Sequence, residues 1–60
     1  MTLTIYFKNC TMKEYTVKNE PHVIYNEIWN IDCLSFEVLY CGSYFYNAID
    51  LKNIERYEVK

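Results

Sequence analysis

The chain has 60 residues, of which 52% are hydrophobic and 18% aromatic, and its formal net charge is −2. This length allows one domain, residues 1–60, and the apolar content excludes a disordered chain. No apolar run approaches the roughly 18 residues needed to cross a bilayer, and no apolar leader segment begins the chain, so we expect a cytoplasmic protein without a membrane partner.

The three cysteines, Cys10, Cys33 and Cys41, form no Cys-x-x-Cys pair, so we expect reduced thiols and no disulfide framework. A domain of this size removes only about 60% of its unfolded surface from water and needs further stabilisation. The 11 aromatic rings also exceed what one small core can enclose, and clustered exposed apolar surface marks interaction sites. We therefore expect a homo-oligomer, with a dimer favoured.

The first predicted element is a strand over residues 2–7, which are β-branched, aromatic or apolar throughout. Leu3, Ile5 and Phe7 share one face of this strand. Residues 12–17 alternate in the same way and predict a second strand, paired with the first across a short turn.

The length of that turn decides which side chains meet. A two-residue turn at Asn9-Cys10 would set Ile5 opposite Glu14. A three-residue turn ending at Thr11 sets Ile5 opposite Tyr15 instead. Because a slip of one residue exchanges the faces, matching apolar to apolar favours the three-residue turn.

The stretch from Pro21 to Asp32 fits two patterns. One apolar set has helical spacing, with Pro21 in the first turn, and another alternates as in a strand. We favour the strand and leave the helix open. The helical set is Ile24, Tyr25, Ile28 and Trp29, and the strand set is Val23, Tyr25, Trp29 and Ile31.

A second hairpin is predicted from residues 34–40 and 43–49. Cys41-Gly42 supplies its two-residue turn, because the glycine can adopt a positive φ. This turn pairs Val38 with Phe45, which predicts a good apolar contact.

The same register divides the four rings around the turn. Phe45 and Tyr40 are expected to point inward, whereas Tyr44 and Tyr46 point to the opposite side of the sheet, next to Glu37.

Asp50 is expected to cap a single helical turn, and residues 54–59 predict a last strand with Tyr57 and Val59 facing inward. The predicted fold is therefore mainly β. It is a small antiparallel sheet or partly open barrel of about five strands, built from two hairpins and a C-terminal strand, with at most one short helix.

Catalysis is not expected. His22 is the only histidine and lies far in sequence from every cysteine, and the cysteine spacings lack the close ligand pairs of a zinc site. Cys33 is expected to be a small core residue, and Cys10 and Cys41 to be turn residues. A single glycine cannot form a phosphate-binding loop. We predict a non-enzymatic protein without a metal or other cofactor.

Charge is segregated along the chain. Residues 19–51 contain no lysine or arginine but five acids, whereas both flanking segments are net basic. An acidic middle would repel nucleic-acid phosphates, so direct nucleic-acid binding is disfavoured, and it would attract a basic protein surface. The alternative interpretation is that these acids only form a solvated face. They are Glu20, Glu27, Asp32, Glu37 and Asp50.

Two segments resemble known proteins. The run Leu3-Thr-Ile-Tyr-Phe-Lys-Asn9 and the run Ile49-Asp-Leu-Lys-Asn-Ile-Glu-Arg-Tyr-Glu-Val59 are similar to those of very small β-rich proteins of phages and integrated elements of Gram-positive bacteria. Cys10 stands where such proteins more often have glycine. The resemblance implies an accessory protein of the host-cell cytoplasm, and several proteins of this kind are counter-defence factors that block a bacterial immune protein.

Two functions follow as expectations. The first is inhibition of a host anti-phage defence protein, for example one that handles nucleic acid. The chain would bind this target through an acidic and aromatic surface. The second is an Sm-like or SH3-like oligomer that binds a small nucleotide signal or RNA, for which folding would have to gather Lys8, Lys13 and Arg56. The residues predicted to bind the protein partner are Trp29, Tyr44, Tyr46 and Glu37, supported by Glu27 and Asp32.

Overall fold

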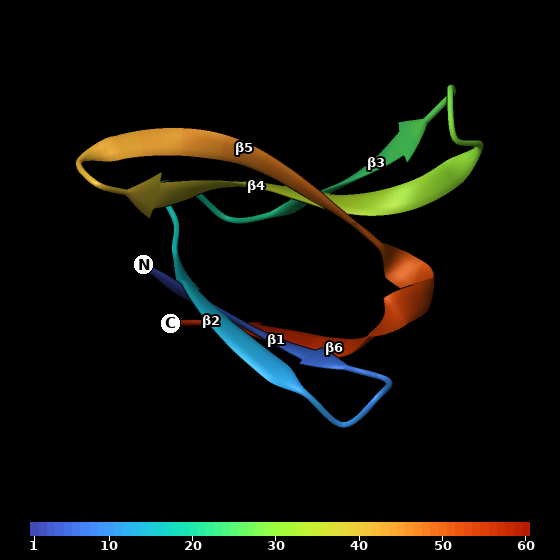
Figure 1. Cartoon of the computed structure of the whole chain (residues 1–60), viewed down its shortest axis with the longest axis horizontal. Helices are drawn as coiled ribbons and strands as arrows, with labels where there is room; N and C mark the ends of the chain where they lie inside the picture. Colours follow the sequence, from blue (N-terminus) through green and yellow to red (C-terminus); the bar gives the residue numbers. More distant parts are fainter.

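The computed structural model describes all 60 residues and contains two three-stranded antiparallel sheets (Figure 1). The first sheet has the order β2-β1-β6 and consists of β1 (Thr2–Phe7), β2 (Met12–Thr16) and β6 (Ile54–Val59). The second has the order β3-β4-β5 and consists of β3 (His22–Asn26), β4 (Ile31–Tyr40) and β5 (Ser43–Asp50). A 3-10 turn, η1 (Leu51–Asn53), links β5 to β6.

The mainly β prediction is confirmed, with six strands in place of about five. The extra strand arises because Pro21 to Asp32 contains β3, a turn and the start of β4, so it forms a third hairpin. The two sheets do not close into a barrel. Besides the packing of the core between them, one isolated bridge links them, from Val17, which follows β2, to Val38 of β4. No helix is long enough to cross a membrane, since η1 has three residues.

The hydrophobic core lies between the two sheets and is small. Leu3 and Ile5 of β1 pack with Leu34 and Phe36 of β4, and Val17 and Ile54 complete the cluster. Only eight of the 60 residues are buried. Phe36 is the one buried ring, and seven of the 11 rings are exposed. Most of the aromatic surface therefore lies outside the core of a single chain.

The predicted register of the first hairpin is wrong by two residues. The structure sets Leu3 opposite Tyr15 and Ile5 opposite Lys13. The turn does have three residues, but the Phe7 N–H donates to the Thr11 carbonyl at 2.8 Å, so the turn ends at Cys10. Cys10 has φ +69°, the left-handed conformation that closes a turn of this type. A slip of two residues keeps each side chain on its face, so apolar matching could not detect it.

The predicted register of the β4–β5 hairpin is confirmed. Val38 lies opposite Phe45, and Glu37 lies opposite Tyr46. Tyr40 and Phe45 share the core-side face, as predicted, but they are 67% and 53% exposed. They remain uncovered because the hairpin extends past the first sheet (Figure 1).

The C-terminal elements also match their predictions. The Asp50 side chain accepts a hydrogen bond from the Lys52 N–H at 2.9 Å and so caps η1. In β6, Tyr57 lies opposite Ile5 and Val59 opposite Leu3, which places both on the core-side face.

Leu34→Ala is expected to lower the free energy of unfolding by about 2–5 kcal/mol, because it leaves a cavity at a fully buried position. Urea unfolding followed by circular dichroism measures the change. Leu39→Ala is the matched control on the opposite face of β4, where the side chain is exposed, and should cost about 1 kcal/mol or less. Equal losses would contradict the location of the core.

Cys41→Asn is expected to stabilise the fold by about 1 kcal/mol. Cys41 has φ +50° and Gly42 has φ +80°, as in a type I′ turn, and asparagine adopts this left-handed conformation more readily than cysteine. The midpoint of urea unfolding should rise with an unchanged slope. Cys41→Val should lower the midpoint, because a β-branched side chain is strained there, and a lower midpoint for the asparagine variant would refute the assignment.

Candidate protein-interaction site

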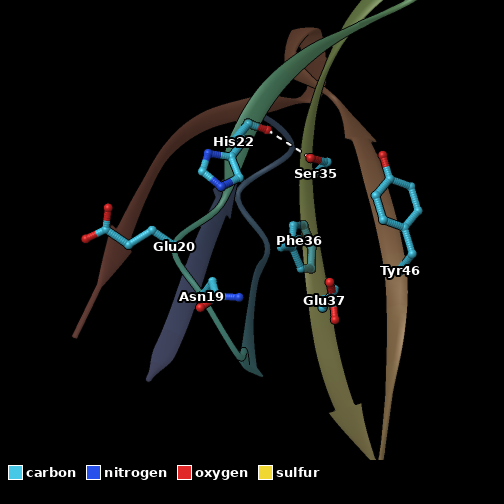
Figure 2. Close-up of a pocket in the computed structure, with 7 residues that line it drawn as sticks. All are labelled: Asn19, Glu20, His22, Ser35, Phe36, Glu37 and Tyr46. Carbon is cyan, nitrogen blue, oxygen red and sulfur yellow. Dashed lines mark hydrogen bonds between the residues drawn. The ribbon is translucent and has the colours of Figure 1, made fainter.

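A groove crosses the second sheet on the face turned away from the core (Figure 2). It encloses a volume of about 160 Å³. Figure 2 shows His22 and Tyr46 at opposite sides, with the β4 residues Ser35, Phe36 and Glu37 between them. We call this the acidic groove. Its lining residues are Asn19, Glu20, His22, Ser35, Phe36, Glu37 and Tyr46.

The pairing of β3 with β4 builds one side of the groove. His22 lies opposite Ser35, and the Ser35 hydroxyl donates a hydrogen bond to the His22 carbonyl oxygen at 3.2 Å. Ser35 is buried, and a buried hydroxyl without a hydrogen-bond partner would destabilise the fold. This bond supplies the partner. Since the proton of Ser35 points to a backbone oxygen, Ser35 serves as a structural link between the strands.

The charges of the groove are all negative. Glu20 and Glu37 are its acidic residues, and no lysine or arginine lines the groove. Figure 2 shows the Glu20 side chain pointing away from Tyr46, so Glu20 adds negative charge at the margin of the groove. The wider second sheet, residues 22–50, has four acids and no base, for −4, whereas the rest of the chain has six bases and four acids, for +2. The first sheet with its turn, residues 2–16 and 54–59, has three bases and three acids, so the acidic excess belongs to the second sheet alone. A cationic partner group would be attracted to this side of the molecule.

Aromatic surface continues from the groove toward the β4–β5 turn. Tyr46 and Tyr44 lie opposite Glu37 and Leu39, so these four side chains share the outer face of the hairpin. We call them the hairpin face. All four are exposed, as was predicted for both tyrosines. Rings beside a carboxylate can stack on an arginine that the carboxylate pairs with.

Lys18 already places a cation against this surface. Its Nζ lies 5.7 Å from the centre of the Tyr44 ring, and its backbone N–H donates to the Glu37 carbonyl at 3.3 Å. The hairpin face thus has an internal cation–π contact at one ring. A partner's cation would compete with Lys18 there, whereas Tyr46 has no such contact.

The other predicted partner-binding residues lie elsewhere. Trp29 and Glu27 belong to the β3–β4 turn, at the opposite end of β4 from the hairpin turn (Figure 1). Asp32 of β4 is two positions before Leu34, so these two residues share the core-side face of the strand. Glu37 lies on the opposite face. The predicted set therefore occupies two separate surfaces. Of the six residues, only Glu37, Tyr44 and Tyr46 lie together.

The β3–β4 turn is an ordered second patch. The Asn26 side-chain oxygen accepts hydrogen bonds from the N–H groups of Ile28 and Trp29, at 3.0 and 3.1 Å. Asn30 closes the turn with φ +55°, and its side chain accepts a hydrogen bond from Tyr25. The result is an exposed pair at the tip, with Ile28 91% and Trp29 71% exposed.

Only two of the seven residues that line the groove, Glu37 and Tyr46, were among the predicted partner-binding residues. Glu20, His22 and Ser35 are among those that were not predicted, and His22 is exposed. The signal that would have found them is the pairing of β3 with β4, which brings His22 to Ser35.

The cysteines are distributed as predicted. Cys33 is buried, whereas Cys10 and Cys41 are exposed in two different turns, and all three are free. No group of three or more histidine, cysteine, aspartate or glutamate residues lies close enough to hold a metal ion.

Comparisons with protein-family models, with curated proteins and with solved structures find no match to this chain. The function therefore has to be argued from the geometry and charge of the site itself.

Tyr15 supports the groove from the core side. Its ring lies 5.1 Å from that of Phe36, centre to centre, and burial raises the pKa of the Tyr15 phenol above its ordinary value. The folded state then binds the phenolic proton more tightly than the unfolded chain does.

We therefore expect Tyr15 to stabilise the fold fully at pH values below the unfolded pKa of about 10, and this contribution to fall as the pH rises beyond it. Urea unfolding at a series of pH values measures the decline. Tyr15→Phe should reduce the decline, whereas Tyr46→Phe, at an exposed ring, should keep it. If the free energy of unfolding of Tyr15→Phe falls with pH as steeply as that of the parent chain, groups other than Tyr15 cause the fall.

Proposed function

We propose that this protein is a non-enzymatic inhibitor that covers a basic surface of a target protein, using the acidic groove and the hairpin face as its contact. The observation that carries the proposal is the pairing of Glu37 with Tyr46 in a groove that no lysine or arginine lines, with Glu20 as a second acid at its margin. An arginine of the target would pair with the Glu37 carboxylate and stack on the Tyr46 ring, and Glu20 would add to the attraction.

The binding surface has the features of a protein contact. Tyrosine is enriched among the residues that dominate binding energy, and a rim of opposite charge steers the partner into place. The hairpin face adds Tyr44 and Leu39 as apolar area beside the groove. The turn with Ile28 and Trp29 lies at the far end of β4 and is not required for this contact.

The target class is proposed from the resemblance to small phage-type proteins. Some of these block bacterial anti-phage defence proteins, and defence proteins that handle nucleic acid carry basic surfaces that match an acidic groove. We therefore propose a host defence protein as the target, met in the host-cell cytoplasm.

The geometry gives less support to binding of a nucleotide signal or RNA. Lys13 lies opposite Ile5 and Arg56 opposite Tyr6, so the register places them on opposite faces of the first sheet. Arg56 is also occupied, since it stacks at 3.8 Å on the Tyr6 ring and pairs with Glu58 at 2.8 Å. One chain therefore does not gather the bases that phosphates need.

The test is capture of a stoichiometric protein by the immobilised chain from bacteria that carry an anti-phage defence system, followed by affinity measurement with the recovered partner. Glu20→Gln with Glu37→Gln should weaken binding by about twofold to thirtyfold, since each exposed ion pair contributes about 0.2–1 kcal/mol. Lys18→Ser should strengthen binding, because it removes the base beside the groove and frees the Tyr44 ring. Added salt should weaken binding in all cases.

Glu27→Gln with Asp32→Asn is the matched control, since it removes the same charge at the other end of β4. It should leave the affinity nearly unchanged. Equal weakening by both double variants would mean that the partner senses only net charge, and the groove would not be the contact. Release of a bound nucleotide on denaturation, without any protein partner, would instead support the alternative function.

A further inference from the structure

The four edge strands of the two sheets differ in how they are protected against pairing with another chain. In the first sheet, β2 carries Lys13 and Glu14, and β6 carries Glu55, Arg56 and Glu58. Charged side chains on an edge strand discourage a second chain from adding to it. Both edges of the first sheet therefore have the usual protection.

The second sheet lacks this protection. Its edge strands are β3 and β5, and neither contains a lysine or an arginine. β3 is short, with five residues, and it follows Pro21, which has no N–H to donate. β5 has eight residues, no proline and no bulge. The edge of β5 is thus the longest unprotected edge in the molecule.

The edge of β5 also has a defined set of free backbone groups. Tyr40 and Ser43 flank the two-residue turn and form a hydrogen-bonded pair, and such pairs alternate along an antiparallel ladder. Phe45 and Asn47 therefore direct their N–H and C=O groups to β4. Tyr44, Tyr46 and Ala48 direct theirs to the open edge, and a chain that adds to β5 would bond to these three residues.

The side chains of β5 fit a second copy of the same strand. Residues 43–49 carry no charge, so two copies can lie antiparallel without repulsion between like charges. An edge meant for a basic partner strand would be expected to carry acids. The only acid, Asp50, stands at the end of the strand.

We propose that the chain forms a homodimer in which β5 pairs antiparallel with β5 of a second copy, with Tyr46 at the twofold axis. This register joins the two second sheets into one sheet of six strands. It sets Tyr44 opposite the partner's Ala48, and Phe45 opposite the partner's Asn47. The two Phe45 rings then lie diagonally across the axis, within reach of each other on the core-side face.

The pairing covers apolar surface that one chain leaves open. On the core-side face, Tyr40 and Phe45 are 6.4 Å apart, centre to centre, and both are exposed, with Val38 and Asn47 beside them. In the dimer, two such patches adjoin. On the outer face, the two acidic grooves lie on the same side of the joined sheet, so both can face one partner or two neighbouring ones.

The first measurement is sedimentation equilibrium over a range of concentrations, in which the mass should rise from that of a 7.3 kDa monomer to twice that value. Asn47→Lys should raise the dissociation constant by about tenfold or more, because it places two lysines near the axis. Thr16→Lys is the matched control on an exposed residue of an edge that is already charged, and it should not change the dissociation constant.

Hydrogen exchange of single amides, followed by NMR, locates the interface. At concentrations that favour the dimer, the amides of Tyr44, Tyr46 and Ala48 should gain protection, and they should lose it on dilution and in Asn47→Lys. Phe45 and Asn47 should be protected in both states, which also shows that the hairpin remains folded.

Two results would overturn the proposal. One is a monomer at every concentration up to the millimolar range. The other is a dimer that persists in Asn47→Lys with no gain of protection at the three outward amides, which would place the interface on another surface. Neither result bears on the acidic groove, since Asn47 lies on the opposite face of the sheet.

Discussion

The contact between β1 and β4 is the interaction on which the rest of the structure depends. Leu3 and Ile5 meet Leu34 and Phe36 across the space between the sheets, and these side chains make up most of the buried core. A core of this size accommodates aliphatic side chains and one phenylalanine. The other rings therefore lie at its margin or on the surface, where they contribute little to the stability of a single chain but offer apolar area to a partner.

β4 connects this core to the proposed binding site. Along the strand, Leu34 and Phe36 face the core, whereas Ser35 and Glu37 face the opposite side. Because side chains alternate, packing of the first pair holds the second pair in position. The Ser35 hydroxyl then holds the first residue of β3 in place through its hydrogen bond to the His22 carbonyl. Glu37 pairs with Tyr46 across the strands and so sets the position of that ring. A change that loosens the core would therefore also disturb the groove.

The parts of the fold that were predictable from sequence are those in which local chemistry has one solution. Cys41-Gly42 allows a two-residue turn, and that turn sets Val38 opposite Phe45. The first hairpin was harder, because a shift of two residues preserves every face. The turn after Asn26 was missed because Ile28 and Trp29 stand where polar residues are usual, and they mimic helical spacing. Asn26 and Asn30 carried the turn signal, through side-chain capping and a left-handed φ. His22 and Ser35, which that hairpin brings together in the groove, were missed with it.

The two proposed interfaces use different chemical groups of the same strand. The groove and the hairpin face use outward side chains of β5, chiefly Tyr44 and Tyr46, whereas self-association uses the backbone groups of these residues at the open edge. Strand geometry separates the two, because side chains stand perpendicular to the sheet and hydrogen bonds lie within it. A target could therefore bind the outer face while β5 remains paired. The acids that would repel a second copy are absent from residues 43–49, and those that would attract a basic target lie on neighbouring segments, at Glu20 and Glu37.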